Sequence, residues 1–164
     1  MTSSHKEQDI VLFESSTDLK NIEKFISKND SHLITFDYKS HEILTIRRVP
    51  HEVSDSFLDE KDIHFLQKES FRLTKWFETK ISDSITHENI NLGELFYIDF
   101  YFILLPVLKE FFEITRIIKK YPNAKFFASS AHYEMIKQFS QYVISLGGKK
   151  LLAKFYLDMI SNRF

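Results

Sequence analysis

Apolar and polar positions follow one another along the chain in an order that predicts strands separated by helices. Short apolar runs without internal polar positions are typical of strands that are covered on both faces. Such runs predict strands at residues 9–13, 32–36 and 124–128, and a short strand at 50–55. Apolar residues at helical spacing lie between these runs. Helices are therefore expected at residues 18–28, 37–48 and 59–79, from Asn91 to beyond Ile118, and from Ser129 or Ser130 through Leu146.

This order of elements predicts a Rossmann-like α/β fold with three layers, α/β/α. Units of strand, helix and strand favour parallel pairing, with helices on both faces of the sheet. We expect a parallel sheet of about four strands and a long, buried apolar helix. The domain is expected to cover residues 9–146, after a polar N-terminal tail at residues 1–8. The pair Gly147–Gly148 then precedes an amphipathic C-terminal helix within residues 147–164.

The stretch NINLGELFYIDFYFILLPVLKE, residues 89–110, is the most apolar part of the chain. Asn91 is placed to cap a helix, with Glu94 three residues later, and Pro106 is expected to bend that helix. The uninterrupted apolar run, 100–108, is shorter than the roughly 20 residues that span a membrane. A helix that is apolar nearly all round is expected to be buried all round. An interface with another protein or another copy, and membrane insertion, are the alternatives.

Composition removes several classes of function. The 164 residues carry a net charge of −1, whereas nucleic-acid binding needs a basic face, so no nucleic-acid partner is expected. The absence of cysteine excludes disulfides, thiolate metal sites and a cysteine nucleophile. With three glycines the chain has no glycine-rich nucleotide loop, and no cofactor is expected. The polar N-terminus does not resemble a signal peptide, which favours a cytoplasmic location, with a peripheral position on the membrane as the alternative.

Polar residues that follow the predicted strands supply the candidate chemistry. The carboxyl ends of parallel strands meet at one edge of a sheet, and ligands bind there. Carboxylates, hydroxyls and imidazoles at that edge suit a sugar or phosphate ligand, or acid–base chemistry. The alternative is that these residues cap the helices that follow. The candidate ligand-binding residues are Glu14, Ser15, Asp37, His41, Asp55, Ser129, Ser130 and His132.

Other combinations of polar residues give no catalytic motif. The seven histidines include no close pair at metal-ligand spacing, so no metal site is expected. His41 and His51 flank one helix and are able to approach each other. A triad of Ser129, His41 and Asp37 lacks the G-x-S-x-G turn that would support it. Asp99, within an apolar helix, must be paired, protonated or at an edge, and an edge position with a structural partner is favoured.

Four segments together resemble a known family: LITFDYKSHEIL, VPHEVSDSFLDEKDI, NINLGELFYIDFYFILLPVLKE and KKYPNAKFFASS. They are similar to the N-terminal half of microbial surface-polysaccharide biosynthesis proteins, which are glycosyltransferase-like enzymes with two Rossmann-like domains (GT-B). The likeness covers residues 9–130. It implies an N-terminal, acceptor-side domain that meets a saccharide acceptor and is inactive without a C-terminal domain of the same longer protein.

Two other functions remain open from the sequence. The aromatic-rich helix, or the final helix, suits a non-enzymatic interaction module that forms a homo-oligomer. The polar strand ends suit a small, stand-alone ligand-binding α/β protein. On each of these hypotheses the chain is expected to have no transmembrane segment.

Overall fold

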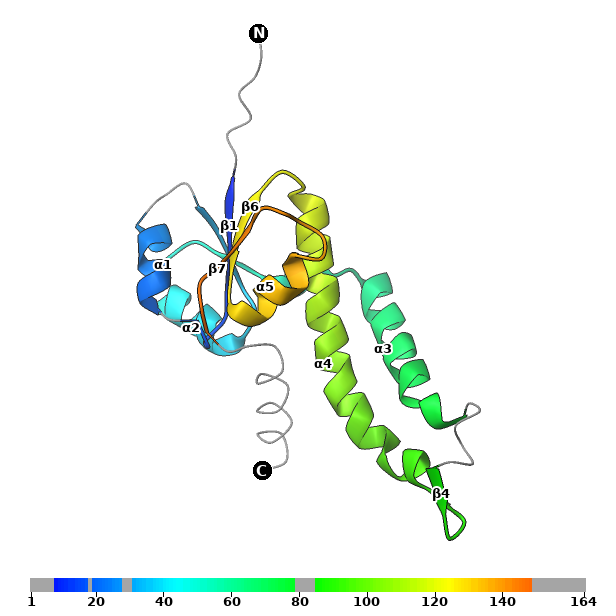
Figure 1. The fold of residues 1–164 in the computed structure, drawn as a ribbon. Coiled ribbons are helices and arrows are strands. Elements are labelled where there is room, and N and C mark those ends of the chain that lie inside the picture. Colours follow the sequence, from blue (N-terminus) through cyan, green and yellow to red (C-terminus); the bar gives the residue numbers. More distant parts are fainter. Residues whose placement is uncertain (1–7, 18, 28–30, 79–84, 149–164) are drawn as a thin grey trace. The chain divides into compact units, whose positions relative to one another are not determined.

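The computed structural model describes most of the chain as two compact units (Figure 1). Unit 1 combines residues from 1–57 with residues from 113–164, and unit 2 consists of residues from 58–112. The predicted N-terminal tail and C-terminal helix lie almost entirely outside the described residues. The described residues are 8–17, 19–27, 31–78 and 85–148.

Unit 1 is built on a parallel sheet of five strands. The first strand lies in the middle, and the strand order is β3-β2-β1-β6-β7. Asp9 at the start of β1 lies opposite Ser31 of β2 on one side and Lys125 of β6 on the other. The predicted parallel α/β sheet is confirmed, with five strands instead of about four. The strands are β1 (Asp9–Phe13), β2 (Ser31–Thr35), β3 (Glu52–Val53), β6 (Lys125–Ala128) and β7 (Val143–Ser145).

Helices cover both faces of this sheet. Successive residues of β1 point to opposite faces, and each set packs against different helices. Ile10 and Leu12 belong to one apolar cluster, which includes residues of α5 and of the end of α4. Val11 and Phe13 belong to a second cluster, which includes residues of α1 and α2. β1 is therefore buried on both faces, as its continuous apolar run predicts. These helices are α1 (Leu19–Ile26), α2 (Tyr38–Ile46), α4 (Leu92–Lys120) and α5 (Ser130–Ile136).

The fifth strand replaces the second half of a predicted helix. The helix that the sequence predicts through Leu146 ends at Ile136, and the chain then returns to the sheet as β7. Val143 and Ile144 are β-branched, and they pair with Phe126 and Phe127 of β6. The apolar spacing of this segment fits a helix. As a strand, however, the segment forms hydrogen bonds with the backbone groups at the edge of β6, and this tertiary contact overrides the local pattern.

The C-terminus of α2 places a residue other than glycine in the left-handed region. Arg48 has a φ of 53°. Its N–H donates to the carbonyl of Thr45, and the N–H of Val49 donates to the carbonyl of Leu44. These two hydrogen bonds form a Schellman cap, in which glycine is the favoured residue at the left-handed position.

We expect Arg48→Gly to raise the free energy of unfolding by about 0.5–1 kcal/mol, because glycine adopts this conformation without the steric strain of a Cβ atom. Arg47, one residue earlier, has a φ of −78° and is the matched control. Arg47→Gly is expected to lower the free energy of unfolding, since glycine loses more chain entropy there and relieves no strain. Urea denaturation of both variants measures the two effects, and equal signs would contradict the assignment.

Unit 2 contains two helices that lie side by side, α3 and the first part of α4 (Figure 1). Asp59 caps α3 by accepting a hydrogen bond from the N–H of Asp62. Asn91 caps α4, because its Oδ1 accepts hydrogen bonds from the N–H groups of Gly93 and Glu94. The other elements of unit 2 are short. Their bounds are α3 (Glu60–Thr74), a 3-10 helix η2 (Trp76–Glu78), β4 (Thr86–His87) and β5 (Ile90–Asn91).

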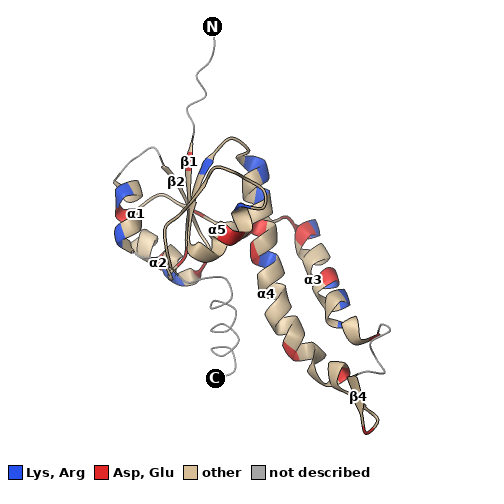
Figure 2. Ribbon diagram, viewed as in Figure 1, with Lys and Arg blue, Asp and Glu red and all other residues tan. Residues whose placement is uncertain are grey.

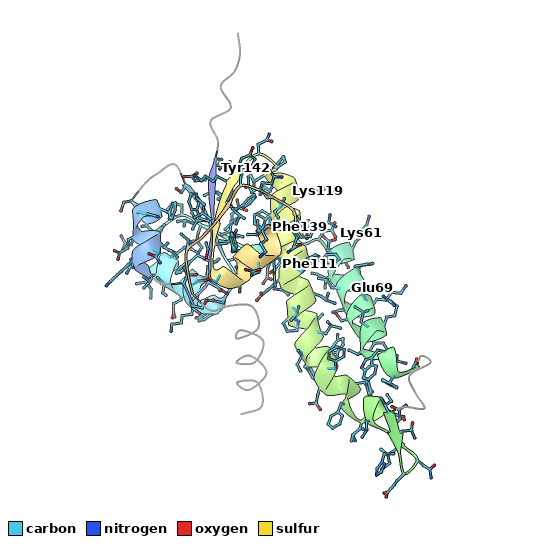
Figure 3. The ribbon with its side chains drawn as sticks, viewed as in Figure 1. Lys61, Glu69, Phe111, Lys119, Phe139 and Tyr142 are labelled. Atoms are coloured by element: carbon cyan, nitrogen blue, oxygen red, sulfur yellow. The ribbon has the colours of Figure 1, made fainter. Side chains whose placement is uncertain are left out.

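The first part of the long apolar helix α4 is not buried all round, so that prediction is wrong here. One stripe of the helix contacts α3, where Tyr97 and Tyr101 pack edge-on against Phe71. On other sides Leu95 is 60% exposed and Phe102 is 66% exposed, and Figure 3 draws the side chains of this helix. A single neighbouring helix covers only one stripe of α4, which explains the difference. Among the described residues, no helix combines the length and apolarity needed to cross a membrane.

Candidate functional site

The carboxyl ends of β1 and β6 mark the point where the strand order of the sheet reverses. From β1 the sheet extends through β2 and β3 on one side, and through β6 and β7 on the other. Ligands of open parallel sheets bind beside such a point. Five of the predicted residues follow these two strands: Glu14, Ser15, Ser129, Ser130 and His132.

A buried carboxylate and a buried imidazole lie at the centre of this edge. Glu14 is 3% exposed and His132 is fully buried. Glu14 Oε2 lies 3.9 Å from His132 Nε2, and Glu14 Oε1 accepts a 2.7 Å hydrogen bond from Ser16 Oγ. The His132 ring also packs against Phe36, with 4.3 Å between ring centroids. These contacts join the loops that follow β1, β2 and β6.

The loop after β7 reaches the same edge. The N–H of Ser130 donates a 2.9 Å hydrogen bond to the carbonyl of Gly147. Gly148 has a φ of 98°, and a Cβ atom at this position would lie 3.1 Å from the carbonyl oxygen of Ser16. Glycine allows both the left-handed conformation and the close approach. The loops after β1, β6 and β7 therefore form one continuous surface.

Asp37 joins the loop after β2 to this surface and also caps a helix. Its Oδ2 accepts a 2.6 Å hydrogen bond from the N–H of Ser15, while its Oδ1 accepts one of 2.7 Å from the N–H of Ser40 at the start of α2. Ser129 caps α5 in the same manner, since its Oγ accepts a hydrogen bond from the N–H of His132. Capping, the alternative reading of these residues, is thus observed for both.

The remaining two predicted residues, His41 and Asp55, lie farther from this centre. His41 is on α2, and its Nδ1 is 2.8 Å from His51 Nε2, so these two histidines do approach each other, as the sequence allows. His51 Nδ1 lies 2.8 Å from the carbonyl of Val49. A carbonyl only accepts, so neutral His51 carries its proton on Nδ1, and His41 Nδ1 donates to His51 Nε2. Asp55 is exposed in a 3-10 helix (Ser54–Phe57) after β3, two strands away from β1.

The chemistry of the predicted set is acidic and rich in hydroxyl groups. Its eight residues include three carboxylates and three serines, together with two histidines, and they include neither lysine nor arginine. Phosphate recognition usually relies on charged donors or on glycine-rich backbone loops. Within the described ranges, no group of three or more His, Asp or Glu residues is arranged to hold a metal ion.

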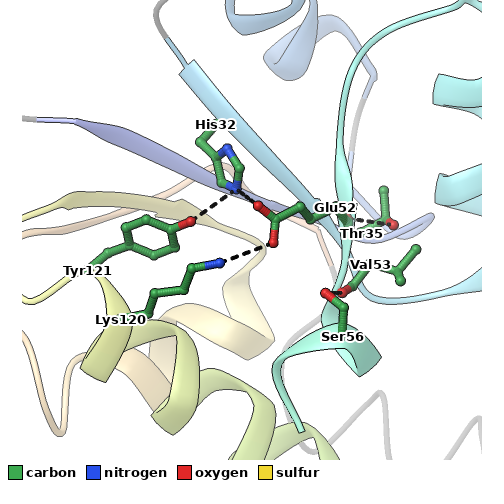
Figure 4. Close-up of polar contacts among 7 residues, drawn as sticks. All are labelled: His32, Thr35, Glu52, Val53, Ser56, Lys120 and Tyr121. Atoms are coloured by element: carbon green, nitrogen blue, oxygen red, sulfur yellow. Dashed lines mark hydrogen bonds and ion pairs between the residues drawn. The ribbon is translucent and has the colours of Figure 1, made fainter.

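A second polar cluster, at the amino ends of β2 and β3, is one that sequence reasoning missed (Figure 4). Glu52 Oε1 lies 2.9 Å from His32 Nε2, and Glu52 Oε2 lies 3.4 Å from Lys120 Nζ. The Tyr121 hydroxyl is 3.4 Å from the same nitrogen of His32. These residues come from three separate parts of the chain, so no local spacing reveals them. The cluster fastens the C-terminal end of α4 to the sheet.

Lys120→Met is expected to reveal a small, pH-dependent contribution of this cluster to stability. The side-chain hydrogen bond with Tyr121, helped by that with Glu52, raises the pKa of Lys120 above its usual 10.5. A raised pKa in the folded state stabilises the fold below pH 10.5, and this stabilisation is lost as the pH rises through the folded-state pKa. Because the Lys120 side chain is half exposed, we expect a loss of roughly 0.2–1 kcal/mol at pH 7.

Urea denaturation at pH 7 and at pH 11 measures this effect, and Lys119→Met is the control on the neighbouring exposed lysine labelled in Figure 3. The difference between the Lys120→Met variant and the wild type should shrink at the higher pH. A difference that is the same at both pH values would show that packing of the lysine stem, and not its charge, stabilises the fold.

No protein-family model, curated protein or solved structure matches this chain. The strand order and the residues at the carboxyl edge of the sheet are therefore the features that bear on its function.

Proposed function

We propose that this chain is a Rossmann-like, acceptor-side domain of a glycosyltransferase-like protein of surface-polysaccharide biosynthesis. It binds a saccharide acceptor at the carboxyl edge of its sheet. The observation that carries the proposal is the order β3-β2-β1-β6-β7. If the five strands of this sheet are numbered in chain order, β6 is the fourth and β7 the fifth, and the order becomes the 3-2-1-4-5 of Rossmann-like domains. Ligands of those domains bind between the first and the fourth strand. The likeness of the four quoted segments supports the family.

The residues at this edge favour a saccharide over a nucleotide. Dinucleotide domains carry G-x-G-x-x-G after the first strand, so that the backbone approaches a pyrophosphate. Here the corresponding loop is Glu14-Ser15-Ser16-Thr17, without glycine. Carboxylates and serine hydroxyls provide the acceptors and donors that sugar hydroxyls need. Ser15, Asp37 and Ser130 are at least partly exposed and are the residues proposed to contact the ligand.

The isolated chain is expected to lack transferase activity. Glu14 and His132, the pair best suited to acid–base chemistry, are enclosed by the loops that they join. A general acid or base has to lie within hydrogen-bonding reach of the reacting group. In this proposal a C-terminal domain holds the nucleotide-sugar donor and completes the site.

Titration of the ¹⁵N-labelled full chain with a panel of neutral oligosaccharides tests the proposal. We expect amide shifts at Ser15, Ser130 and Gly147, and no hydrolysis or transfer with nucleotide sugars. Ser130→Ala should weaken binding. Ser27→Ala, which changes a serine at the end of α1 whose hydroxyl bonds to the carbonyl of Glu23, should leave binding unchanged. Turnover of a nucleotide sugar by this chain alone would refute an inactive acceptor-side domain, and an absence of shifts with every saccharide would refute the ligand class.

A further inference from the structure

The helices of unit 2 expose a large apolar surface. Between Glu94 and Lys109, Asp99 is the only charged residue of α4, and this part of the helix is almost uncharged in Figure 2. At roughly 100 Å² for each half-exposed aromatic or large aliphatic side chain, α3 and α4 together expose roughly 1,000 Å². The residues concerned are Ile63, Phe65, Phe71, Leu73, Leu92, Leu95, Phe96, Ile98, Phe100, Phe102 and Phe111.

This total is spread over several sides of the two helices, so no single side exposes all of it. The largest apolar patch on a typical monomer covers about 300–600 Å². A stable interface buries about 800 Å² on each partner. The exposed apolar side chains of α3 and α4 together supply enough area for such an interface if the partner contacts more than one side of the helices.

The side of α4 that faces α3 is already covered. Tyr97 and Tyr101 pack against Phe71, and Phe112 packs against Phe65 with 5.5 Å between ring centroids. An additional partner therefore has to contact another side of the helix.

A second side of α4 carries apolar residues three or four positions apart, which is the spacing of a helix–helix seam. Phe102 lies near its middle and is the most exposed large apolar residue of α4, at 66%. We call this side the outer stripe. Its residues are Leu95, Ile98, Asp99, Phe102, Pro106 and Lys109.

The charges of the outer stripe are self-complementary in one direction only. Its acidic residue, Asp99, lies before Phe102, and its basic residue, Lys109, lies after it. In a parallel pair, Asp99 of one copy would face Asp99 of the other, and like charges repel. In an antiparallel pair centred on Phe102, Asp99 of one copy lies within about one helical turn of Lys109 of the second copy.

We propose that a second copy of this chain covers the outer stripe. The two α4 helices pair antiparallel about a twofold axis near Phe102. A symmetric dimer of this kind uses the same patch on both copies. Two helical hairpins that meet in this way bury each other's apolar sides as in a four-helix bundle. This interface uses none of the residues at the carboxyl edge of the sheet, so it does not depend on the saccharide proposal.

Sedimentation equilibrium of the full chain between 1 and about 100 µM tests the proposal, with a dimer of twice the 19.6 kDa chain mass as the expected result. Phe102→Glu should raise the dimer Kd at least about thirty-fold, the size expected for a central interface residue. Phe96→Glu is the matched control, because Phe96 is an exposed phenylalanine of the same helix, about 120° away from Phe102. It should change Kd by less than about threefold.

Cross-linking gives an independent readout, because the chain has no cysteine of its own. Phe102→Cys places one thiol close to the proposed axis in each copy, and mild oxidation should produce a covalent dimer. Phe96→Cys should produce little. Asp99→Lys should weaken the dimer, and Lys109→Asp in the same chain should restore it.

A wild-type chain that stays monomeric at 100 µM overturns the proposal and leaves the outer stripe to another segment of the same chain or to a different protein. A dimer that Phe96→Glu weakens as strongly as Phe102→Glu overturns the assignment to the outer stripe. Failure of the Asp99 and Lys109 exchange to restore the dimer overturns the antiparallel arrangement.

Discussion

Gly93→Ala is expected to destabilise unit 2 by roughly 2–3 kcal/mol, although alanine is a better helix former than glycine. Gly93 is the second residue of α4. A Cβ atom there would overlap the Cβ atom of Phe77 and lie 2.5 Å from its Cγ. Phe77 is buried in η2 and has little room to move. The close approach of η2 to the start of α4 therefore requires the absence of a side chain at this position.

The steric explanation and helix propensity predict opposite signs for the change in stability caused by Gly93→Ala. If the close approach did not exist, alanine would stabilise the helix by about 0.8–1 kcal/mol. Trp76, the only tryptophan, lies beside Phe77 in η2, so its fluorescence during urea denaturation reports on this part of the chain. In a Phe77→Ala background the penalty of Gly93→Ala should largely disappear. A penalty of the same size in both backgrounds would contradict the steric explanation.

Phe126→Ala is expected to lower the free energy of unfolding by about 3–5 kcal/mol, because it leaves a cavity in the centre of the sheet. Phe126 is fully buried in β6 and packs in the apolar cluster that contains Ile10 and Ile114. It connects β1 with the C-terminal end of α4, so few neighbours are free to fill the space. Urea denaturation followed by far-UV circular dichroism measures the loss.

Phe139→Ala is the matched control for Phe126→Ala. Phe139 follows α5, is 48% exposed and is labelled in Figure 3. The same truncation there should lower the free energy of unfolding by at most about 1.5 kcal/mol, since much of the ring remains in water. Similar losses for the two variants would mean that Phe126 does not lie in the central core.

The parts of the fold that the sequence predicted are those with a local signal. β1 is a continuous apolar run and was located at both ends, Asp9 and Phe13. Ser129 is predicted as a helix cap, because a capping side chain acts on an N–H only three residues away. The gathering of residues after β1, β2 and β6 also follows from a general rule of parallel sheets.

The parts that were missed depend on residues far apart in the sequence. β7 forms because β6 lies next to it, which the apolar spacing of Val143 and its neighbours does not show. The exposure of Phe102 depends on how many helices surround α4. The requirement for glycine at position 93 arises from the path of η2, and the cluster around Glu52 joins three distant segments. Whether Ser15, Asp37 and Ser130 bind a saccharide stays a prediction.

Because unit 2 interrupts unit 1 in the sequence, one of the two neighbours of the central strand is far away along the chain. Asp9 pairs with Ser31 nearby in the chain, but its other neighbour, Lys125, is synthesised only after the whole of unit 2. Closing a long loop is entropically unfavourable, and helical hairpins with local contacts form faster than sheets with distant pairings. The packing of Phe65 against Phe112 holds the two ends of unit 2 together. Early formation of that hairpin would shorten the effective loop between β1 and β6, and unit 2 would then assist the folding of the sheet.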